Sequence, residues 1–150
     1  MTISQTAEYA LRATLHLATR TAIPLSTRQI AQATRVPGGY LSKVLQELGH
    51  AGLVTSRAGR RGGFVLARPA NQISVLDVIN AVDPIERIDG CPLGLPEHRT
   101  DLCPLHRRLD RAIGLMRQAF AETTLAELVA ENACAAGATA PVIAAPPATV

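Results

Sequence analysis

Four side chains that could bind a metal or undergo redox chemistry lie close together in the 150-residue chain: Cys91, His98, Cys103 and His106. Cys103 and His106 stand three positions apart at an expected helix start, where side chains at i and i+3 share a face and can bind one metal ion. Thiolate and imidazole ligands suit several centres. The residues therefore leave open a zinc site, an iron–sulfur cluster, a redox-active thiol pair and an empty loop.

The N-terminal sequence indicates the cellular compartment, and the compartment bears on the role of the cysteines. The first apolar stretch is interrupted by Glu8 and Arg12, and no uncharged run is apolar enough to span a bilayer. We therefore expect a cytoplasmic protein, in which three cysteines are more often ligands or redox thiols than a disulfide framework. Cys134 lies apart from the others and is expected to be uninvolved.

The segments that flank this loop predict how the chain is divided. Residues 84–103 contain three prolines and two glycines and form the expected sensor loop. From Pro104 a helical apolar stripe runs to Phe120, and we interpret it as a dimerisation helix; the alternative is a helix packed on its own domain. Thr124 begins a short last helix to about Asn132. These two helices make up residues 104–132, and residues 133–150 read as a disordered, Ala- and Pro-rich tail.

Residues 1–83 predict a winged helix-turn-helix domain. A first helix over 4–20 precedes a capping box at Ser26–Gln29, which begins a helix ending near Thr34. Pro37 suits the first turn of the next helix, whose apolar stripe is Leu41, Val44, Leu45 and Leu48.

Two alternating stretches, 53–57 and 64–67, predict a hairpin with a glycine-rich loop that is basic through Arg57, Arg60 and Arg61. A further capped helix follows at Ser74 and ends before Pro84. The fold class is therefore mainly α with a small β-hairpin, plus a long dimerisation helix.

Charge is divided unevenly between the two halves of the chain. Residues 1–70 hold nine Lys and Arg against two acids, a balance of +7, whereas the rest hold six against ten, −4, for the net +3. A basic half that coincides with the helix-turn-helix favours double-stranded DNA as the partner. A solvated basic loop on a small α+β module is the plainer alternative. The expected DNA contacts are Thr27, Arg28, Gln29, Pro37, Gly38, Gly39, Tyr40, Lys43, Arg57, Arg60, Arg61 and Gly62.

Several motifs together resemble the Rrf-two family of bacterial winged-helix regulators, which includes the iron–sulfur sensors IscR and NsrR. The resemblance covers residues 1 to about 132. It rests on Glu8-Tyr9-Ala10-Leu11-Arg12, on residues 36–45, on Gly59-Arg60-Arg61-Gly62-Gly63-Phe64-Val65-Leu66, on Ser74-Val75-Leu76-Asp77-Val78-Ile79 and on the closing residues 124–132. The resemblance implies a homodimeric transcription factor, usually a repressor, that reads a palindrome with one winged helix per half-site.

The resemblance also implies which residues hold a cofactor. Cys91 matches the first and Cys103 the last of the family's three cluster cysteines, while the middle one is missing and Glu97 or His98 stands in its neighbourhood. His106 matches an additional histidine ligand. Glu8 matches a carboxylate that completes the site from the partner subunit.

Two cysteines with histidine and carboxylate candidates favour a 2Fe-2S over a 4Fe-4S cluster, sensing redox state, nitric oxide or iron–sulfur status. The alternative is the same DNA-binding regulator switched by zinc, or by thiol–disulfide chemistry, without a cluster. A metal-dependent redox enzyme is a weaker alternative, because no general base stands beside an open metal position. We expect no catalytic residues.

Overall fold

The computed structural model describes residues 3–20, 22–91 and 102–137. Helices dominate, and within the described residues the one sheet is a two-stranded antiparallel hairpin, so the mainly α fold class is confirmed. The elements are α1 (Gln5–Thr19), α2 (Thr27–Thr34), α3 (Gly38–His50), β1 (Val54–Arg57), β2 (Gly63–Leu66), η1 (Ala70–Gln72), α4 (Val75–Val82), α5 (Pro104–Glu122) and α6 (Leu125–Gly137).

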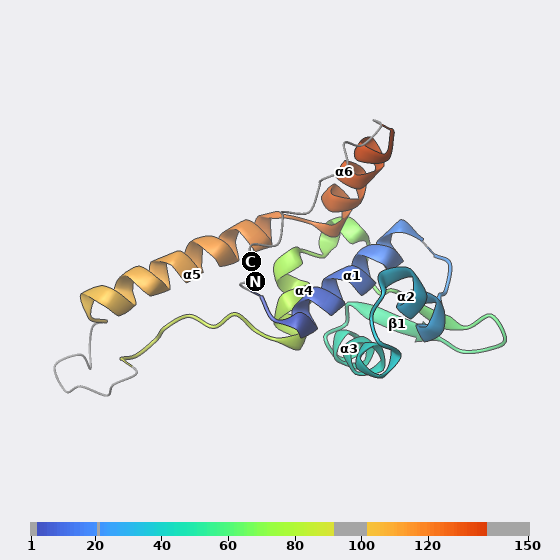
Figure 1. Ribbon diagram of the computed structural model, residues 1–150, viewed down its shortest axis with the longest axis horizontal. Helices are drawn as coiled ribbons and strands as arrows, with labels where there is room; N and C mark the ends of the chain where they lie inside the picture. Colours follow the sequence, from blue (N-terminus) through green and yellow to red (C-terminus); the bar gives the residue numbers. More distant parts are fainter. Residues whose placement is uncertain (1–2, 21, 92–101, 138–150) are drawn as a thin grey trace, which may run out of the picture.

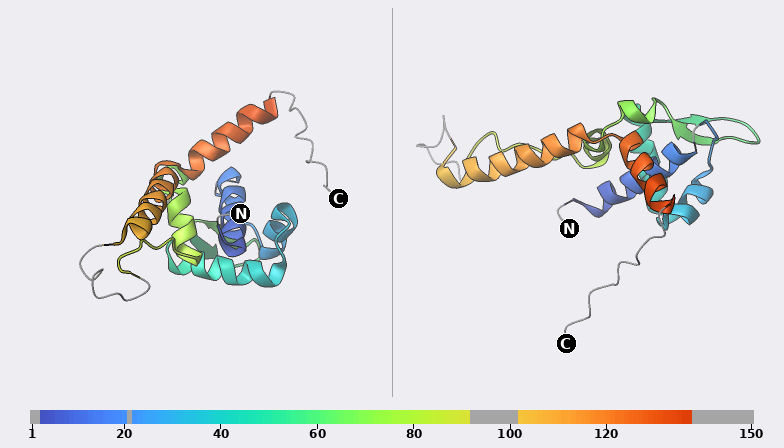
Figure 2. Two further views of the ribbon diagram at one scale, coloured as in Figure 1. Left: turned by 60° about the vertical axis from the view of Figure 1, so that its left-hand side comes forward. Right: turned by 90° about the horizontal axis from the view of Figure 1, so that it is seen from above.

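Helix α1 is the centre of the core. Ser4 caps it by accepting a hydrogen bond from the Ala7 amide at 3.2 Å. Its small residues Ala7, Ala10 and Ala13 are fully buried, and they allow α2, α3, α4 and α6 to pack closely around it. Figures 1 and 2 show α1 between α4 and α2. The helix that the sequence placed over 4–20 therefore forms the scaffold of the domain.

The helix-turn-helix forms where the sequence predicts it. Helix α2 ends at Arg35, a non-glycine residue in the left-handed conformation with φ +56°. Pro37 has ψ 132° and lies immediately before α3, so the expectation that it occupies the first turn was wrong by one position. The predicted stripe is buried as expected: Leu41, Val44, Leu45 and Leu48. Gly52, at φ +69°, follows the end of α3.

The wing is joined to the rest of the domain by a third stretch of backbone. Strands β1 and β2 pair from Val54 opposite Leu66 to Arg57 opposite Gly63. Leu25 then pairs with Phe64, with N–H to O distances of 3.0 and 2.8 Å in the two directions. A Cβ atom on Gly63 would lie 2.5 Å from the Leu25 backbone, so only glycine allows this approach.

Backbone hydrogen bonds attach the start of α6 to the helix-turn-helix domain. The Val75 amide donates to the Thr123 carbonyl and the Leu125 amide to the Ile73 carbonyl, each at 2.9 Å, which fixes the start of α6 against α4. Helix α6 continues to Gly137 rather than ending near Asn132, because the intervening alanines are strong helix formers. The disordered tail was expected over residues 133–150: residues 133–137 belong to α6 instead, and residues 138–150 lie outside the described residues.

Helix α5 projects from the domain as an arm (Figure 1). None of its residues is buried, although Phe120 at its C-terminal end packs beside Ile79 of α4. The apolar stripe expected along this helix is therefore present but uncovered over most of its length. Within the described residues, no helix has both the length and the apolar character that crossing a membrane requires.

Candidate DNA-binding surface and sensor loop

The first turn of α2 is held by the expected capping box. The Gln29 amide donates to Ser26 Oγ at 3.3 Å, and the Ser26 amide donates to Gln29 Oε1 at 2.8 Å. Arg28 is exposed and Thr27 is half-buried. Because the side-chain oxygen of Gln29 accepts hydrogen bonds within the cap, its side-chain NH₂ is the group that can donate to a ligand.

The N-terminal end of α3 is bare. A Cβ atom on Gly38 or Gly39 would meet nothing within 4 Å, and neither residue has positive φ, so packing within the chain does not require glycine at either position. Pro37 provides no side-chain cap, which leaves the first amides of α3 without such a partner. Exposed amides at the positive end of a helix are well suited to a phosphate.

Two exposed side chains lie on the outer face of α3 next to this end. Tyr40 is 61% exposed, and its ring meets that of Tyr9 in α1 edge to face, with centroids 6.1 Å apart. Lys43 lies one turn further along and has a 74% exposed side chain, 3.9 Å from Glu47. Glycines, tyrosine and lysine thus share one solvent-facing surface, as the spacing predicts.

The wing presents its arginines to solvent. Arg57, Arg60 and Arg61 are exposed, and no salt bridge in the described part of the chain involves them. Gly62 lies at the inner end of the loop, where a Cβ atom would be 2.3 Å from the Arg57 carbonyl oxygen. The turn of the hairpin therefore requires glycine at this position.

The segment expected to be a sensor loop ends at Cys103, at the start of α5. Cys103 is the N-cap residue: its sulfur accepts a hydrogen bond from the His106 amide at 3.5 Å and lies 3.1 Å from His106 Nδ1. Both side chains are half-buried. The predicted pairing of these two side chains on one face of the helix is therefore present.

Within the described residues, Cys91 and Glu8 do not join this pair in one ligand group. Cys91 is half-buried, and Glu97 and His98 lie outside the described residues. Glu8 is on α1 in the body of the domain, where its carboxylate contacts Arg12 at 2.9 Å. Within the described residues, no group of three or more His, Cys, Asp or Glu side chains could hold a metal ion.

Two contacts at the site were not predicted from the sequence. One is the Tyr9–Tyr40 pair, which connects α1 to α3. The other is an ion pair between Arg87, ahead of the sensor loop, and Asp110 in α5, with Nε to Oδ1 at 2.6 Å. Both join residues far apart in the chain, so no local spacing signals them. Gly114, a glycine inside a helix, is the one hint of a close approach to α5.

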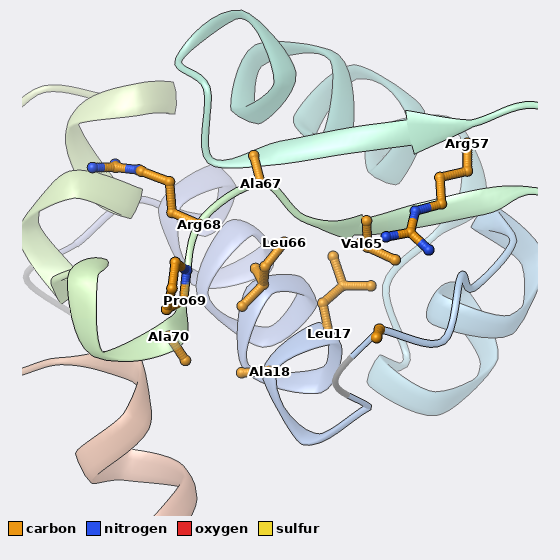
Figure 3. A pocket seen from close by; sticks show the side chains of 10 residues that line it. Leu17, Ala18, Arg57, Val65, Leu66, Ala67, Arg68, Pro69 and Ala70 are labelled. Carbon is orange, nitrogen blue, oxygen red and sulfur yellow. The ribbon is translucent and has the colours of Figure 1, made fainter.

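A pocket of about 360 Å³ lies at the base of the wing (Figure 3). Its wall is mostly apolar and comes from the end of α1, strand β2 and the residues after it, including Leu17, Ala18, Val65 and Ala70. Arg57 lies beside it on the Val65 side, while Arg68 extends away from it (Figure 3). Among the described residues that line it, none carries a carboxylate, thiol or imidazole group.

Comparisons with known proteins agree with this geometry. The family model described as Rrf2, iron-dependent transcriptional regulator, matches residues 3–131. An HTH-type transcriptional regulator of Mycobacterium tuberculosis is 38% identical over 133 residues, which is 85% of this chain and 81% of the relative.

Among solved structures, the global cysteine regulator CymR of B. subtilis superimposes with a TM-score of 0.73 at 28% identity, over 87% of this chain and 98% of that one. IscR of T. potens gives a TM-score of 0.73 at 23% identity, over 88% of each chain, which supports the fold alone. The bare-ended helix and basic wing thus belong to a family of transcriptional regulators rather than enzymes, and the chain is a member of the Rrf2 family of winged helix-turn-helix DNA-binding regulators.

Proposed function

We propose that the protein is a homodimeric DNA-binding regulator, acting as a repressor, whose affinity for a palindromic operator is set by a 2Fe-2S cluster at the sensor loop. The observation that carries this proposal is the Cys103–His106 pair, 3.1 Å from Sγ to Nδ1, at the tip of an arm whose apolar side chains are uncovered. A sensor on the helix that joins two copies would act on both DNA-binding units at once.

The arm supports the dimer. Leu105 and Leu109, which lie on the expected apolar stripe of α5, are 63% and 47% exposed, and large apolar side chains exposed on one face are typical of an interaction surface. A second α5 packed against it would remove these side chains from solvent. Each copy would then carry its own α3 and wing, which matches a two-fold symmetric operator read in successive major grooves.

The DNA contacts follow from the exposed surface. The first turn of α3 enters the major groove, where its amides and Tyr40 and Lys43 meet phosphates and base edges. Arg57, Arg60 and Arg61 of the wing lie along the flanking backbone, and Thr27, Arg28 and Gln29 contact the backbone from α2. The residues that carry these groups are exposed, except for Thr27, which is half-buried. Gly62, the remaining expected contact, is also half-buried. A chain with this role works in the cytoplasm, where bacterial DNA is found.

The donor set fits a two-iron cluster. Thiolates of Cys91 and Cys103 and the imidazole of His106 are ligands that such clusters use. The fourth ligand would be either His98 of the same chain or Glu8 from a second copy. When bound, the cluster would provide a centre that oxidants or nitric oxide alter. The role of this chain is to hold the loop so that loss of the cluster changes the relative orientation of the two wings. The iron-dependent character of the matching family supports the metal.

The experiment compares wild type with a Cys103→Ala, His106→Ala variant after anaerobic reconstitution with iron and sulfide. We expect visible absorption, iron and sulfide in stoichiometric amounts, and a change in affinity for the protein's own upstream DNA in wild type alone. Random duplex of equal length is the control for sequence preference. If the protein is colourless and binds zinc, the proposed cluster is wrong and the site is a zinc site, which the same Cys and His donors also suit. If the protein is colourless and binds no metal, the remaining alternative is a regulator switched by thiol chemistry.

A further inference from the structure

The chain that leads into the sensor loop is fastened to α5 by one carboxylate. Arg87 Nε donates to Asp110 Oδ1 at 2.6 Å, Arg87 Nη2 donates to Oδ2, and the Ile88 amide donates to Oδ1 at 3.0 Å. Paired donation of this kind from a guanidinium to a carboxylate fixes direction as well as distance. We call this arrangement the Arg87–Asp110 clasp.

A second set of contacts holds the same segment about two turns further along α5, at Arg117. Arg117 Nη1 donates to the Ile85 carbonyl, and the Ile85 amide donates to Asn80 Oδ1 at 3.3 Å. The Ile85 side chain packs in the cluster that includes Ile79 and Phe120. Residues 85–88 are therefore held between α4 and α5.

Gly114 provides the space that the clasp needs. A Cβ atom at this position would lie 3.1 Å from Arg87 Nη1 and 3.3 Å from its Cζ. Glycine inside a helix is less favourable than alanine by about 1 kcal/mol, so its presence in α5 requires a reason. The close approach of the Arg87 guanidinium is such a reason.

The position of the clasp fits the spacing of the two cysteines. Cys91 follows Ile88 by three residues, and an extended chain of that length spans roughly 10 Å. Asp110 follows Cys103 by seven residues, a rise of about 10.5 Å along a helix. The chain up to residue 91 runs beside α5 toward the first residue of that helix (Figure 1). An anchor at Asp110 therefore places Cys91 at about the same height along α5 as Cys103, although the described residues of one chain do not gather Cys91, Cys103 and His106 into one ligand group.

We propose that Arg87 and Asp110 are positioning residues of the sensor, which hold Cys91 within reach of the Cys103–His106 pair before any cofactor binds. This inference rests on the proposed function, because it assigns a role to residues that serve the same loop. Without the clasp, residues 86–91 would be free to swing away from α5. Bringing Cys91 back to Cys103 would then cost conformational entropy that the clasp removes in advance.

The first test measures how close the two thiols are in the cofactor-free protein. In a Cys134→Ser background, the protein is equilibrated with glutathione: as Cys91 and Cys103 form a disulfide, one oxidised glutathione is reduced to two reduced glutathiones. The equilibrium constant is the effective concentration of one thiol at the other. We expect Asp110→Asn and Arg87→Gln each to lower it by about tenfold, the loss expected when hydrogen bonds to a charged group are removed.

The controls separate positioning from general stability. Glu122→Gln changes a carboxylate on the same helix that accepts a hydrogen bond from Gln118 at 2.8 Å, and it should leave the thiol equilibrium unchanged. Asp110→Glu keeps the charge and should recover part of the loss. Arg87 has a side chain 52% exposed and lies outside the helices, so Arg87→Gln keeps the fold even if Asp110→Asn should lower the melting temperature.

Anaerobic reconstitution of the same variants distinguishes the clasp from the proposed function. A clasp variant should lose its cluster to a chelator faster than wild type and show an altered visible circular dichroism spectrum. If wild type takes up no cluster but the thiol equilibrium still falls in the variants, the clasp stands and the cluster is wrong. If wild type takes up the cluster and both variants match it in thiol equilibrium and spectrum, the clasp is wrong and the cluster stands. If neither effect occurs, both fail.

Discussion

The ring of Tyr9 meets the ring of Tyr40 edge to face, with centroids 6.1 Å apart and planes inclined by 63°. Tyr9 belongs to α1, the scaffold of the domain, and Tyr40 to the first turn of α3, the helix we place in the major groove. Glu8, the candidate ligand, is the neighbour of Tyr9 in the chain. The pair is thus a direct contact between the scaffold helix α1 and the helix that we place against DNA.

Replacing Tyr9 by leucine should weaken operator binding without unfolding the protein. An aromatic pair contributes about 0.5–1.5 kcal/mol beyond its buried area, so the dissociation constant should rise by about 2- to 12-fold as the first turn of α3 loses its support. Fluorescence anisotropy with labelled operator measures this. Tyr40→Phe keeps the ring contact and tests the hydroxyl alone. Equal affinities of wild type and the Tyr9 variant would show that the contact does not position α3.

Replacing Arg60 and Arg61 by alanine should weaken binding to all DNA sequences alike. Each arginine that neutralises a phosphate adds about 0.9 to the slope of log K against log salt, so the slope should fall by up to roughly 1.8. Titrations at several salt concentrations, with operator and with random duplex, measure it. Arg111→Ala, an exposed arginine of α5, is the control. An unchanged salt dependence in the wing variant would contradict the placement of the wing on the backbone.

Two glycines should respond in opposite ways to alanine. Gly63→Ala should destabilise the fold, because its Cβ would lie 2.5 Å from the Leu25 backbone. Gly38→Ala should raise the melting temperature slightly, because the site has room and alanine is the better helix former, yet it should weaken DNA binding by placing a methyl group before the phosphate. Thermal unfolding and operator binding measure the two effects. A Gly38 variant with full DNA affinity would show that this end of α3 does not approach DNA closely.

The Asp110 carboxyl should titrate well below its ordinary range. Hydrogen bonds from Arg87, then the Ile88 amide and the charge of Arg87, lower its pKa from 3.8 to about 2. Because the pKa is lower in the folded than in the unfolded chain, the clasp is complete above about pH 4 and its contribution is lost as pH falls toward 2. Arg87→Gln should bring the pKa back toward 3.8, as measured by carboxyl carbon NMR.

Glu127 serves as the internal reference for that titration. The Thr124 amide, followed by the Thr124 hydroxyl, lowers the pKa of this carboxyl, and neither group touches Arg87. Its titration should therefore be the same in wild type and in Arg87→Gln. A parallel change at Glu127 and Asp110 would indicate a general loss of structure rather than loss of the clasp.

Local patterns predicted the elements because their causes are local. The capping box at Ser26 and Gln29, the stripe from Leu41 to Leu48 and the glycine after α3 each depend on residues within a few positions of one another, and the structure has all of them. The error at Pro37 has a similar cause, since proline is favoured both just before a helix and in its first turn. The end of α6 was placed too early because the turn-forming character of the tail outweighed its alanines.

The candidate site could be predicted only in part. The i, i+3 spacing of Cys103 and His106 was enough to place their side chains together. The Arg87–Asp110 contact joins residues 23 positions apart across a segment with no regular period, so nothing in the sequence indicates it. In the described part of one chain, Glu8 does not join Cys103 and His106 in a group that could hold a metal ion. Its assignment as a ligand stays a prediction that depends on a second copy.

The backbone pairing of Leu25 with Phe64 ties the wing to the residue just before the Ser26 cap of α2. Helix and hairpin therefore have no hinge between them at that point, and they must travel together as one body. In the proposed dimer, a signal at the arm would therefore change how two such bodies are spaced and tilted relative to each other. Regulation would then depend on how well the spacing of the two DNA-binding units matches the pitch of the double helix.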